Sequence, residues 1–430
     1  MSIANHIKEH SKIGLPFQGG GTSLITVGPG GMFQTFQAAV DYRNTLSHTL
    51  VETVTGSVTG TTSGTVEIRK ITHAATSTNI GKKLWAQVAG TGVLIQCERP
   101  ATTFTLSRYP FKADFASQTV DLYTPKWATI LFLPGYDELI TANITLPSFT
   151  VFKSLVPYAA QLRFDSTHWM VGGLDAQEFW FDGLRILGDF TNTITGKILL
   201  FTADPGGAYL REHANYGFFN CHIDGPHVDI IQWPMTASGL EGGLFVENCK
   251  VSGHYDLFRC ANNREVFFNN NNIYCYNNSY ADSEGCGIAL GFLTASKTAY
   301  PLKVWQVLNN NIEVITEGDY PAYGVKVGVT DAGTPIQAYS DTRTIIRGNT
   351  IKTLCLGSTE NVAGVAQLYA GADADTPYIA VTGNTFDVRN LGTGTALWTN
   401  SAKAGMNIQR GGNHVINGTL GSNTTALTLA

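Results

Sequence analysis

The sequence carries little charge. Of its 430 residues only 14% are Asp, Glu, Lys or Arg, and the formal net charge is −5. It has no basic cluster that would match the phosphates of a nucleic acid. No apolar run approaches the length of a membrane span, and the N-terminal stretch MSIANHIKEHSKIG lacks the apolar segment of a signal peptide. The composition therefore predicts no nucleic-acid partner, no membrane insertion and no secretory route.

The seven cysteines lack the spacing of a disulfide framework or a metal site. They are scattered, their number is odd, and no CxxC pair occurs. Small buried thiols are the favoured interpretation over disulfides or metal ligands. This usage fits a protein made in a reducing cytoplasm, and we expect no metal or other cofactor.

Asparagine, in contrast, is abundant and recurs in a pattern. The stretches EVFFNNNNIYCYNN, QVLNNNIEV, TIIRGNTIKTL and IAVTGNTFDV each contain a short apolar run, a break, and then Asn-x-Ile or Asn-x-Phe. The apolar residues after the break form a column: Ile186, Ile223, Val251, Ile273, Ile312, Ile351, Phe386 and, less clearly, Val415. Two residues earlier stand Leu184, Cys221, Cys249, Asn271, Asn310, Asn349, Asn384 and Asn413. The chain therefore contains an irregular internal repeat.

The repeat length points to a solenoid of strands. Its shortest step, from Val251 to Ile273, is 22 residues, which fits one coil of a parallel β-helix with strands stacked at ~4.8 Å. Asn tolerates the left-handed backbone of a sharp turn, and stacked Asn side chains can hydrogen-bond along a column. We therefore predict a ladder that places the Asn column on one face. The alternative is a set of ordinary hydrophilic loops.

The rest of the chain divides around this solenoid. Phe33, Phe36 and Val40 fall at helical spacing, and a helix with one apolar stripe would cover the open end of a solenoid. The expected organisation is a polar, linker-like segment (1–24), a strand and capping helix (25–47), a small β-rich insertion (48–126), a parallel β-helix of about ten coils (127–418) and a C-terminal tail (419–430).

The stretches LFLPG (131–135) and ITLPSFTVFKSL (144–155) follow the helix and the insertion. This order resembles the first coils of pectate-lyase-like right-handed parallel β-helices, especially bacteriophage tailspikes. The resemblance covers the helix and residues 128–418, and the long insertion departs from the usual opening of that family. It implies an all-β right-handed parallel β-helix, a homotrimer, and attachment to a phage tail or baseplate protein through the N-terminus, which would make residues 1–24 a virion-attachment or linker segment. The expected location is the virion.

The resemblance also implies a polysaccharide partner on the bacterial host surface. The first functional hypothesis is a tailspike that binds and cleaves this polysaccharide as a glycoside hydrolase. The second is a non-catalytic receptor-binding or structural spike with the same fold. A polysaccharide lyase is the third.

Candidate catalytic residues lie in two similar stretches, GPHVDIIQW and GHYDLFRC. Asp229 and Asp256 are 27 residues apart, close to one coil step, and each follows a His-x pair. Adjacent coils would stack these carboxyl groups, so the pKa of one should rise. A protonated acid beside a carboxylate base is what glycoside hydrolysis needs. The next coil offers Asp282 and Glu284 at the same edge.

The sequence thus predicts a catalytic set and a substrate-binding set. The catalytic candidates are Asp229, Asp256 and Glu284, and the substrate-binding candidates are His227, His254, Trp233, Arg259 and Asp282. In the alternative interpretation the His-x-Asp pairs are hydrogen-bonded turn corners. Trp233 would then lie in the core or a trimer interface, and Arg259 in a surface salt bridge.

Overall fold

The computed structural model describes the greater part of the solenoid and the region before it. The described residues are 23–60, 68–74, 79–88, 94–107, 111, 113–165, 167–172, 178–188, 198–201, 215–225, 231–232, 243–254, 256–261, 265–277, 285–291, 303–317, 320–327, 342–357, 362–367, 378–391, 396–399 and 407–418.

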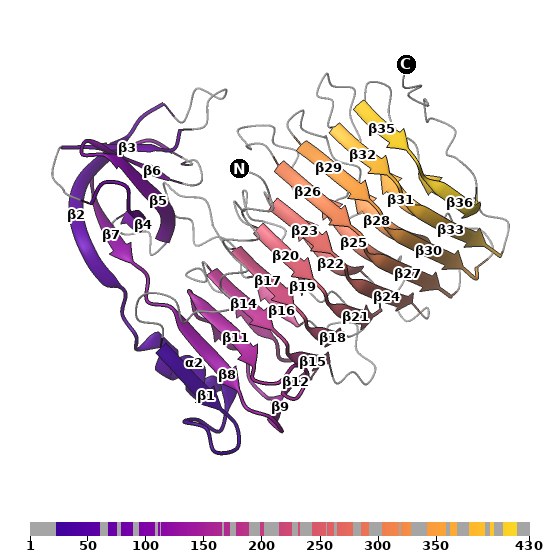
Figure 1. The fold of residues 1–430 in the computed structure, drawn as a ribbon, viewed down its shortest axis with the longest axis horizontal. Coiled ribbons are helices and arrows are strands. Elements are labelled where there is room, and N and C mark those ends of the chain that lie inside the picture. Colours follow the sequence, from indigo (N-terminus) through magenta and orange to yellow (C-terminus); the bar gives the residue numbers. More distant parts are fainter. Residues whose placement is uncertain are drawn as a thin grey trace.

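Three parallel sheets run along the molecule and form the faces of a solenoid (Figure 1). The eleven-stranded sheet contains β1 (Ser23–Val27), β8 (Ala128–Phe132), β11 (Thr150–Ser154), β14 (Glu178–Asp182), β17 (Asn215–Phe219), β20 (Gly243–Glu247), β23 (Glu265–Asn269), β26 (Lys303–Leu308), β29 (Thr342–Arg347), β32 (Tyr378–Thr382) and β35 (Asn407–Gly411).

The other two sheets complete each coil. The ten-stranded sheet contains β9 (Asp137–Ile140), β12 (Gln161–Phe164), β15 (Arg185–Gly188), β18 (His222–Asp224), β21 (Lys250–Gly253), β24 (Asn272–Asn277), β27 (Asn311–Thr316), β30 (Thr350–Cys355), β33 (Thr385–Asn390) and β36 (His414–Asn417). The nine-stranded sheet contains β10 (Ile144–Leu146), β13 (Met170–Gly172), β16 (Leu199–Phe201), β19 (Ile231–Gln232), β22 (Asp256–Ala261), β25 (Gly285–Gly291), β28 (Ala322–Val327), β31 (Val362–Gln367) and β34 (Ala396–Thr399). The predicted right-handed parallel β-helix is confirmed.

The interior is filled by stacked columns of apolar side chains. The predicted column is paired in register from coil to coil, and its members from Ile186 to Phe386 are at most 1% exposed. A second column stacks aromatic rings: Phe152 on Phe181 and Phe181 on Phe218, each with ring centroids 4.9 Å apart. This spacing equals the distance between adjacent strands, so one core position repeats through these three successive coils.

The asparagine column forms the predicted ladder at the corner between the eleven-stranded and ten-stranded sheets. The Oδ1 atom of Asn310 accepts hydrogen bonds from the backbone N–H and the Nδ2 of Asn271, both at 2.9 Å. The same pair of bonds links Asn310 to Asn349, Asn349 to Asn384 and Asn384 to Asn413. Each Nδ2 also donates to a strand carbonyl of the preceding coil, as Asn310 does to Phe268 at 3.1 Å. The ladder therefore satisfies buried backbone groups that the turn leaves without strand partners.

The left-handed backbone lies one residue before the ladder, which the sequence analysis did not separate from it. The φ angles at these positions run from 52° to 70°, and the residues are Gly183, Asn220, Asn248, Asn270, Asn309, Gly348, Gly383 and Gly412. Only Gly and Asn adopt this conformation readily. The paired asparagines of the sequence thus have different roles. The first adopts the left-handed backbone of the turn, and the second forms the ladder.

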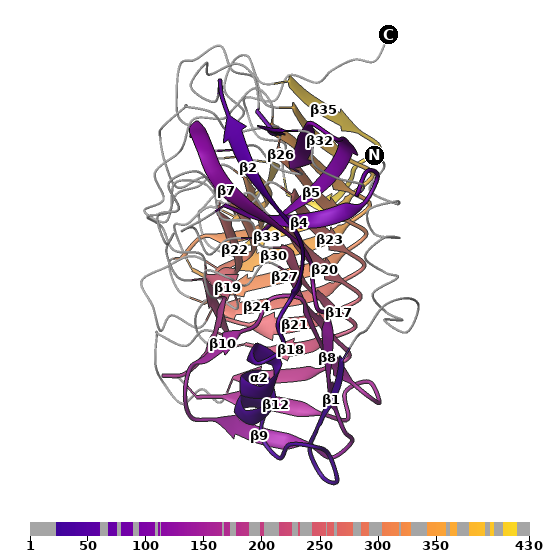
Figure 2. The ribbon, with the colours of Figure 1, turned by 90° about the vertical axis from the view of Figure 1, so that its left-hand side faces the viewer.

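The helix α2 (Phe36–Asn44) lies across the N-terminal end of the solenoid (Figure 2). Phe36 packs against Phe132 and Phe152 in the core, at centroid distances of 5.5 and 5.4 Å. The helix begins later than its predicted stripe, because Thr35 caps it and Phe33 pairs instead with Val27. The buried Arg43 donates to the carbonyls of Lys126 and Ser148. These bonds tie the helix to the chain that enters the first coils.

The insertion forms a closed antiparallel barrel with its own core. Its strands, in barrel order, are β2 (Thr49–Val58), β3 (Lys70–His73), β6 (Phe104–Ser107), β5 (Leu94–Ala101), β4 (Lys83–Val88) and β7 (Phe115–Thr124). Trp85 of the barrel and Trp127 at the start of the solenoid both meet the ring of Phe149 edge-on, at 4.6 and 5.5 Å. These aromatic contacts join the barrel to the first coils.

We expect Asn310→Ala to destabilise the solenoid. The change removes the acceptor of two bonds from Asn271 and leaves the carbonyl of Phe268 without its donor, so the free energy of unfolding should fall by about 3 kcal/mol. The matched control is Asn311→Ala, an exposed neighbour with one side-chain bond to Asn272. Denaturant unfolding should show little change for the control. Equal losses in both variants would contradict the ladder's role.

Candidate functional site

An open groove lies on the outer face of the ten-stranded sheet, over β18, β21, β24 and β27. It encloses about 570 Å³, and its lining includes Lys250, Ser252, His254, Tyr274, Tyr276 and Glu313. It is therefore built from four consecutive coils, and no single loop makes it.

Strand alternation places these side chains outside. Val251 and Ile273 point into the core, so residues one position away on the same strands point outward. The register aligns Asp224, Ser252, Tyr274 and Glu313 across the four strands. One outward column thus presents a carboxylate, a hydroxyl, a phenol and a carboxylate at successive coil steps.

Hydrogen bonds orient both ends of this column. Ser252 Oγ donates to Asp224 Oδ1 at 2.8 Å, and Lys352 Nζ lies 2.5 Å from Glu313 Oε1. Tyr274 lies between them with 40% of its surface exposed. Partial burial, followed by the charge of Glu313, raises the pKa of Tyr274. The phenol is therefore protonated at neutral pH and can donate a hydrogen bond into the groove.

His254 and Tyr276 mark the corner at which the groove meets the nine-stranded sheet. Their ring centroids are 6.1 Å apart. The Tyr276 hydroxyl donates to Glu317 Oε1, and this hydrogen bond is the main reason that the pKa of Tyr276 is raised. The corner thus combines an imidazole, a phenol and a carboxylate.

Of the predicted site residues, His254 lies in the groove, where it is half-buried. Asp256 and Arg259 lie on β22, just past the corner, and only their backbones are described. In the next coil Asp256 pairs with Cys286 and Arg259 with Ala289. Both partners are buried, in a small apolar cluster that is separate from the main core. The other predicted site residues fall outside the described residues: His227, Asp229, Trp233, Asp282 and Glu284.

The strand register bears on the predicted carboxylate column. Ile231 pairs with Phe258, a 27-residue offset that equals the spacing of Asp229 and Asp256. In the following coil, however, Asp256 pairs with Cys286, and Glu284 lies two residues earlier in the sequence. The stacking of Asp229 on Asp256 stays a prediction. Glu284 is not the register partner of Asp256, so its inclusion in the carboxylate column is supported less well.

The predicted site did not include Lys250, Ser252, Tyr274 or Glu313. The signal was available, because each of these residues stands directly before or after a member of the predicted apolar column. A residue adjacent to an inward position on a strand must face outward. The asparagine stretch EVFFNNNNIYCYNN (265–278) therefore carries groove residues as well as the ladder residue Asn271.

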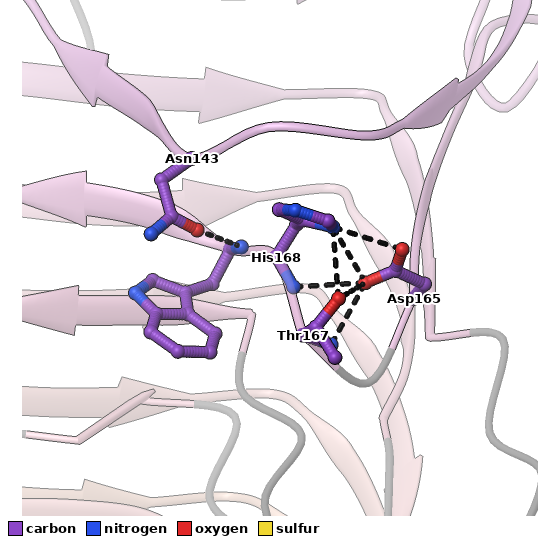
Figure 3. A network of polar contacts seen from close by, with 5 residues as sticks. Asn143, Asp165, Thr167 and His168 are labelled. Atoms are coloured by element: carbon purple, nitrogen blue, oxygen red, sulfur yellow. Dashed lines mark hydrogen bonds and ion pairs between the residues drawn. The ribbon is translucent and has the colours of Figure 1, made fainter.

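A separate His–Asp corner lies between β12 and β13, and Asp165, Thr167 and His168 are among the described residues (Figure 3). Asp165 Oδ1 accepts from the backbone N–H groups of Thr167 and His168 at 2.8 Å each, and His168 Nδ1 lies 2.9 Å from both carboxylate oxygens. Burial opposes ionisation of Asp165, but the bonds from His168 and Thr167 outweigh it and lower its pKa to about 2. This arrangement is a capped turn. In this solenoid, therefore, a neighbouring His and Asp can have a purely structural role, that of stabilising a turn.

All seven cysteines are buried and free, as the sequence predicted. In the described part of the chain, no helix is long and apolar enough to cross a membrane.

No protein-family profile and no curated protein sequence matches this chain. Among solved structures, it is similar to the catalytic domain of a GH87 alpha-1,3-glucanase in complex with nigerose. The two sequences are 10% identical, the alignment covers 89% of this chain and 87% of that chain, and the TM-score is 0.35. It is also similar to the tailspike protein gp49 from Pseudomonas phage LKA1, with 9% identity, coverage of 88% and 66%, and a TM-score of 0.33. A third is the A-module of mannuronan C-5 epimerase AlgE6 from Azotobacter vinelandii, with 13% identity, coverage of 71% and 92%, and a TM-score of 0.29. The assignment of the fold rests on the paired coils of this chain itself.

Proposed function

We propose that this protein is a phage tailspike that binds a bacterial surface polysaccharide along the groove of the ten-stranded sheet and cleaves it. The observation that carries the proposal is the groove, which spans four coils and is lined by hydrogen-bonding groups around Tyr274 and Tyr276. A solenoid repeats its outward positions every ~4.8 Å, so it offers a chain polymer a row of similar sites. Tyrosine adds an apolar face and a polar tip to such a row.

The proposed cleavage site lies at the corner beside His254. The two described carboxylates of the groove, Asp224 and Glu313, are three coil steps apart, or ~14 Å at ~4.8 Å per step. An inverting glycosidase needs its two carboxyl groups within about 9.5 Å, and a retaining one needs them closer. Asp224 and Glu313 are therefore too far apart to act as a pair. Asp256 begins β22 two residues after His254, which lines the groove, and we therefore assign the cleavage to this edge.

In the proposed reaction Asp229 and Asp256 are the acid and base, with Glu284 as the further candidate. One carboxyl, kept protonated by its neighbour, gives its proton to the leaving glycosidic oxygen. The other attacks the sugar or activates water. His227 and His254 tune these groups or hold the sugar. Trp233, Arg259 and Asp282 complete the proposed substrate-binding set.

A non-catalytic receptor-binding spike is the second candidate. One observation favours it: the Asp165–His168 corner is a His–Asp pair whose hydrogen bonds cap a turn. If the His-x-Asp stretches at 227–229 and 254–256 do the same, the groove would bind polysaccharide without cleaving it. The measurement of cleavage described below separates the two candidates.

We expect Tyr274→Ala to weaken polysaccharide binding. Removing a half-exposed ring from the middle of the groove should cost about 1 kcal/mol, or roughly fivefold in Kd. Binding to capsule or lipopolysaccharide from candidate hosts is the measurement. Tyr158→Ala is the matched control, since Tyr158 is 48% exposed but lies outside the groove lining. Equal affinity in wild type and both variants would show that the groove does not bind the polysaccharide.

We expect Asp229→Asn and Asp256→Asn each to slow cleavage. Loss of an essential acid or base should cost at least about 10²-fold in rate with the fold intact. Release of new reducing ends from the bound polysaccharide gives the rate, and thermal unfolding confirms the fold. Full activity in both variants at an unchanged Tm would place the catalytic site elsewhere.

We expect the purified chain to be a homotrimer, with its N-terminal segment free to bind a phage tail or baseplate protein. Closed symmetry covers apolar surface that a single solenoid exposes. Multi-angle light scattering gives the mass directly. A stable monomer of 46.4 kDa at micromolar concentration would contradict this assembly.

A further inference from the structure

Three cationic or titratable side chains stack at one end of the groove face. Arg185, His222 and Lys250 are register partners on β15, β18 and β21. Their neighbours Ile186, Ile223 and Val251 point into the core, so all three face outward. Arg185 and Lys250 are exposed, and His222 is half-buried between them.

This column differs from the other cations on the same face. Arg163 pairs with Asp137 at 2.7 Å, Lys352 with Glu313 at 2.5 Å, and Arg389 with Asp387 at 2.7 Å. For Arg185 and Lys250, in contrast, no carboxylate of the described residues lies within ion-pair distance.

Three carboxylates on the same or adjoining strands have hydrogen-bond or ion-pair partners of their own. Asp224, two residues from His222 on β18, accepts from Ser252. Asp182 binds Lys153 at 2.6 Å, and Glu247 accepts from Asn269 at 3.0 Å. Like charges at one coil spacing repel each other. The pKa of His222 is lowered, first by burial and then by the positive charges of Lys250 and Arg185. The negative charge of Asp224 opposes this shift.

We propose that Arg185, His222 and Lys250 form an anion subsite that binds the carboxylate, sulfate or phosphate group of an acidic saccharide. The guanidinium offers a planar fork of donors to such a group, and the ammonium adds a point charge. A cluster of one sign also raises the local concentration of anions. The choice of an acidic polysaccharide as substrate rests on the proposed function, whereas the binding of a small anion does not.

The subsite is continuous with the groove. Lys250 belongs to both, and the next two members of its column, Asn272 and Asn311, are joined by an amide hydrogen bond of 3.1 Å. A sugar whose acidic group lies on Lys250 would extend over Ser252, the outward neighbour on the same strand, towards Tyr274. The anion subsite therefore fixes one end of the chain, and the tyrosines contact the remainder.

The test follows the His222 imidazole by NMR during titration with methyl glucuronide, at constant ionic strength maintained with chloride. His222→Gln assigns the signal. Bound glucuronide should raise the pKa of His222 by about one unit, because a negative charge then faces the imidazolium. Inorganic sulfate should act in the same direction, which separates the anionic group from the sugar. The matched neutral probe, methyl glucoside, should leave the pKa unchanged.

Two variants complete the experiment. Lys250→Gln should raise the pKa of His222 in the free protein, since a like charge is removed, and should weaken glucuronide binding at least tenfold. Lys82→Gln changes the net charge equally but lies on the barrel, where its ammonium binds Asn79, and should behave as wild type. Both lysines are exposed, so both variants should keep the wild-type Tm.

The proposal is overturned if neither anion moves the His222 titration, or if both move it equally in wild type and Lys250→Gln. The outcome is separable from that of the proposed function. A wild-type response to glucuronide together with unchanged polysaccharide binding in Tyr274→Ala would keep the anion subsite and reject the groove. The reverse pattern would keep the groove and reject the anion subsite.

Discussion

The structure depends on one repeated interaction, the hydrogen bonding of stacked side-chain amides at the corner between the eleven-stranded and ten-stranded sheets. At each rung an Asn Oδ1 accepts both the backbone N–H and the amide of the Asn in the preceding coil. In the earlier coils, sulfur takes the same place, as Cys221 N–H donates to Cys249 Sγ at 3.4 Å. Because each rung bonds to the next at a fixed atom, a coil cannot slip by one residue without breaking the column.

This fixed register carries through to the surface. Once Ile223, Val251 and Ile273 are aligned inside, the residues beside them must align outside. The groove column around Tyr274 and the cationic column around His222 are both consequences of this alignment. In such a solenoid the residues next to the core column face outward and can contact a ligand, and the coil spacing sets how far apart two such groups lie.

The sequence was informative wherever a residue's role is imposed by the backbone. The apolar column, the Asn ladder, the free thiols and the end-capping helix follow from periodicity and turn chemistry, and each is present. The start of α2 was less predictable, because the capping hydroxyl of Thr35 decides it and the apolar stripe does not. The closure of the insertion into a barrel depends on which strands pair, which composition does not encode.

The functional site was harder to predict for a physical reason. Outward side chains pack against solvent or a ligand, so the fold places few constraints on their identity. The predicted site was built on the paired His-x-Asp stretches, and the groove residues were not considered for it. His254 belongs to both and links the two. Groove residues such as Tyr274 could have been found by listing the neighbours of the apolar column. Acid–base roles cannot be read in this way, because they depend on distances between side chains at a corner.

We propose that the register of the coils builds a polysaccharide site on the outer face of the ten-stranded sheet. The most direct measurement is a structure of the protein with an oligosaccharide of the proposed bacterial surface polysaccharide. We predict that the sugar lies over β21 and β24 against Tyr274, with one end at Lys250 or at the His254 corner. A sugar bound on the outer face of the eleven-stranded sheet, or between the barrel and the first coils, would contradict it.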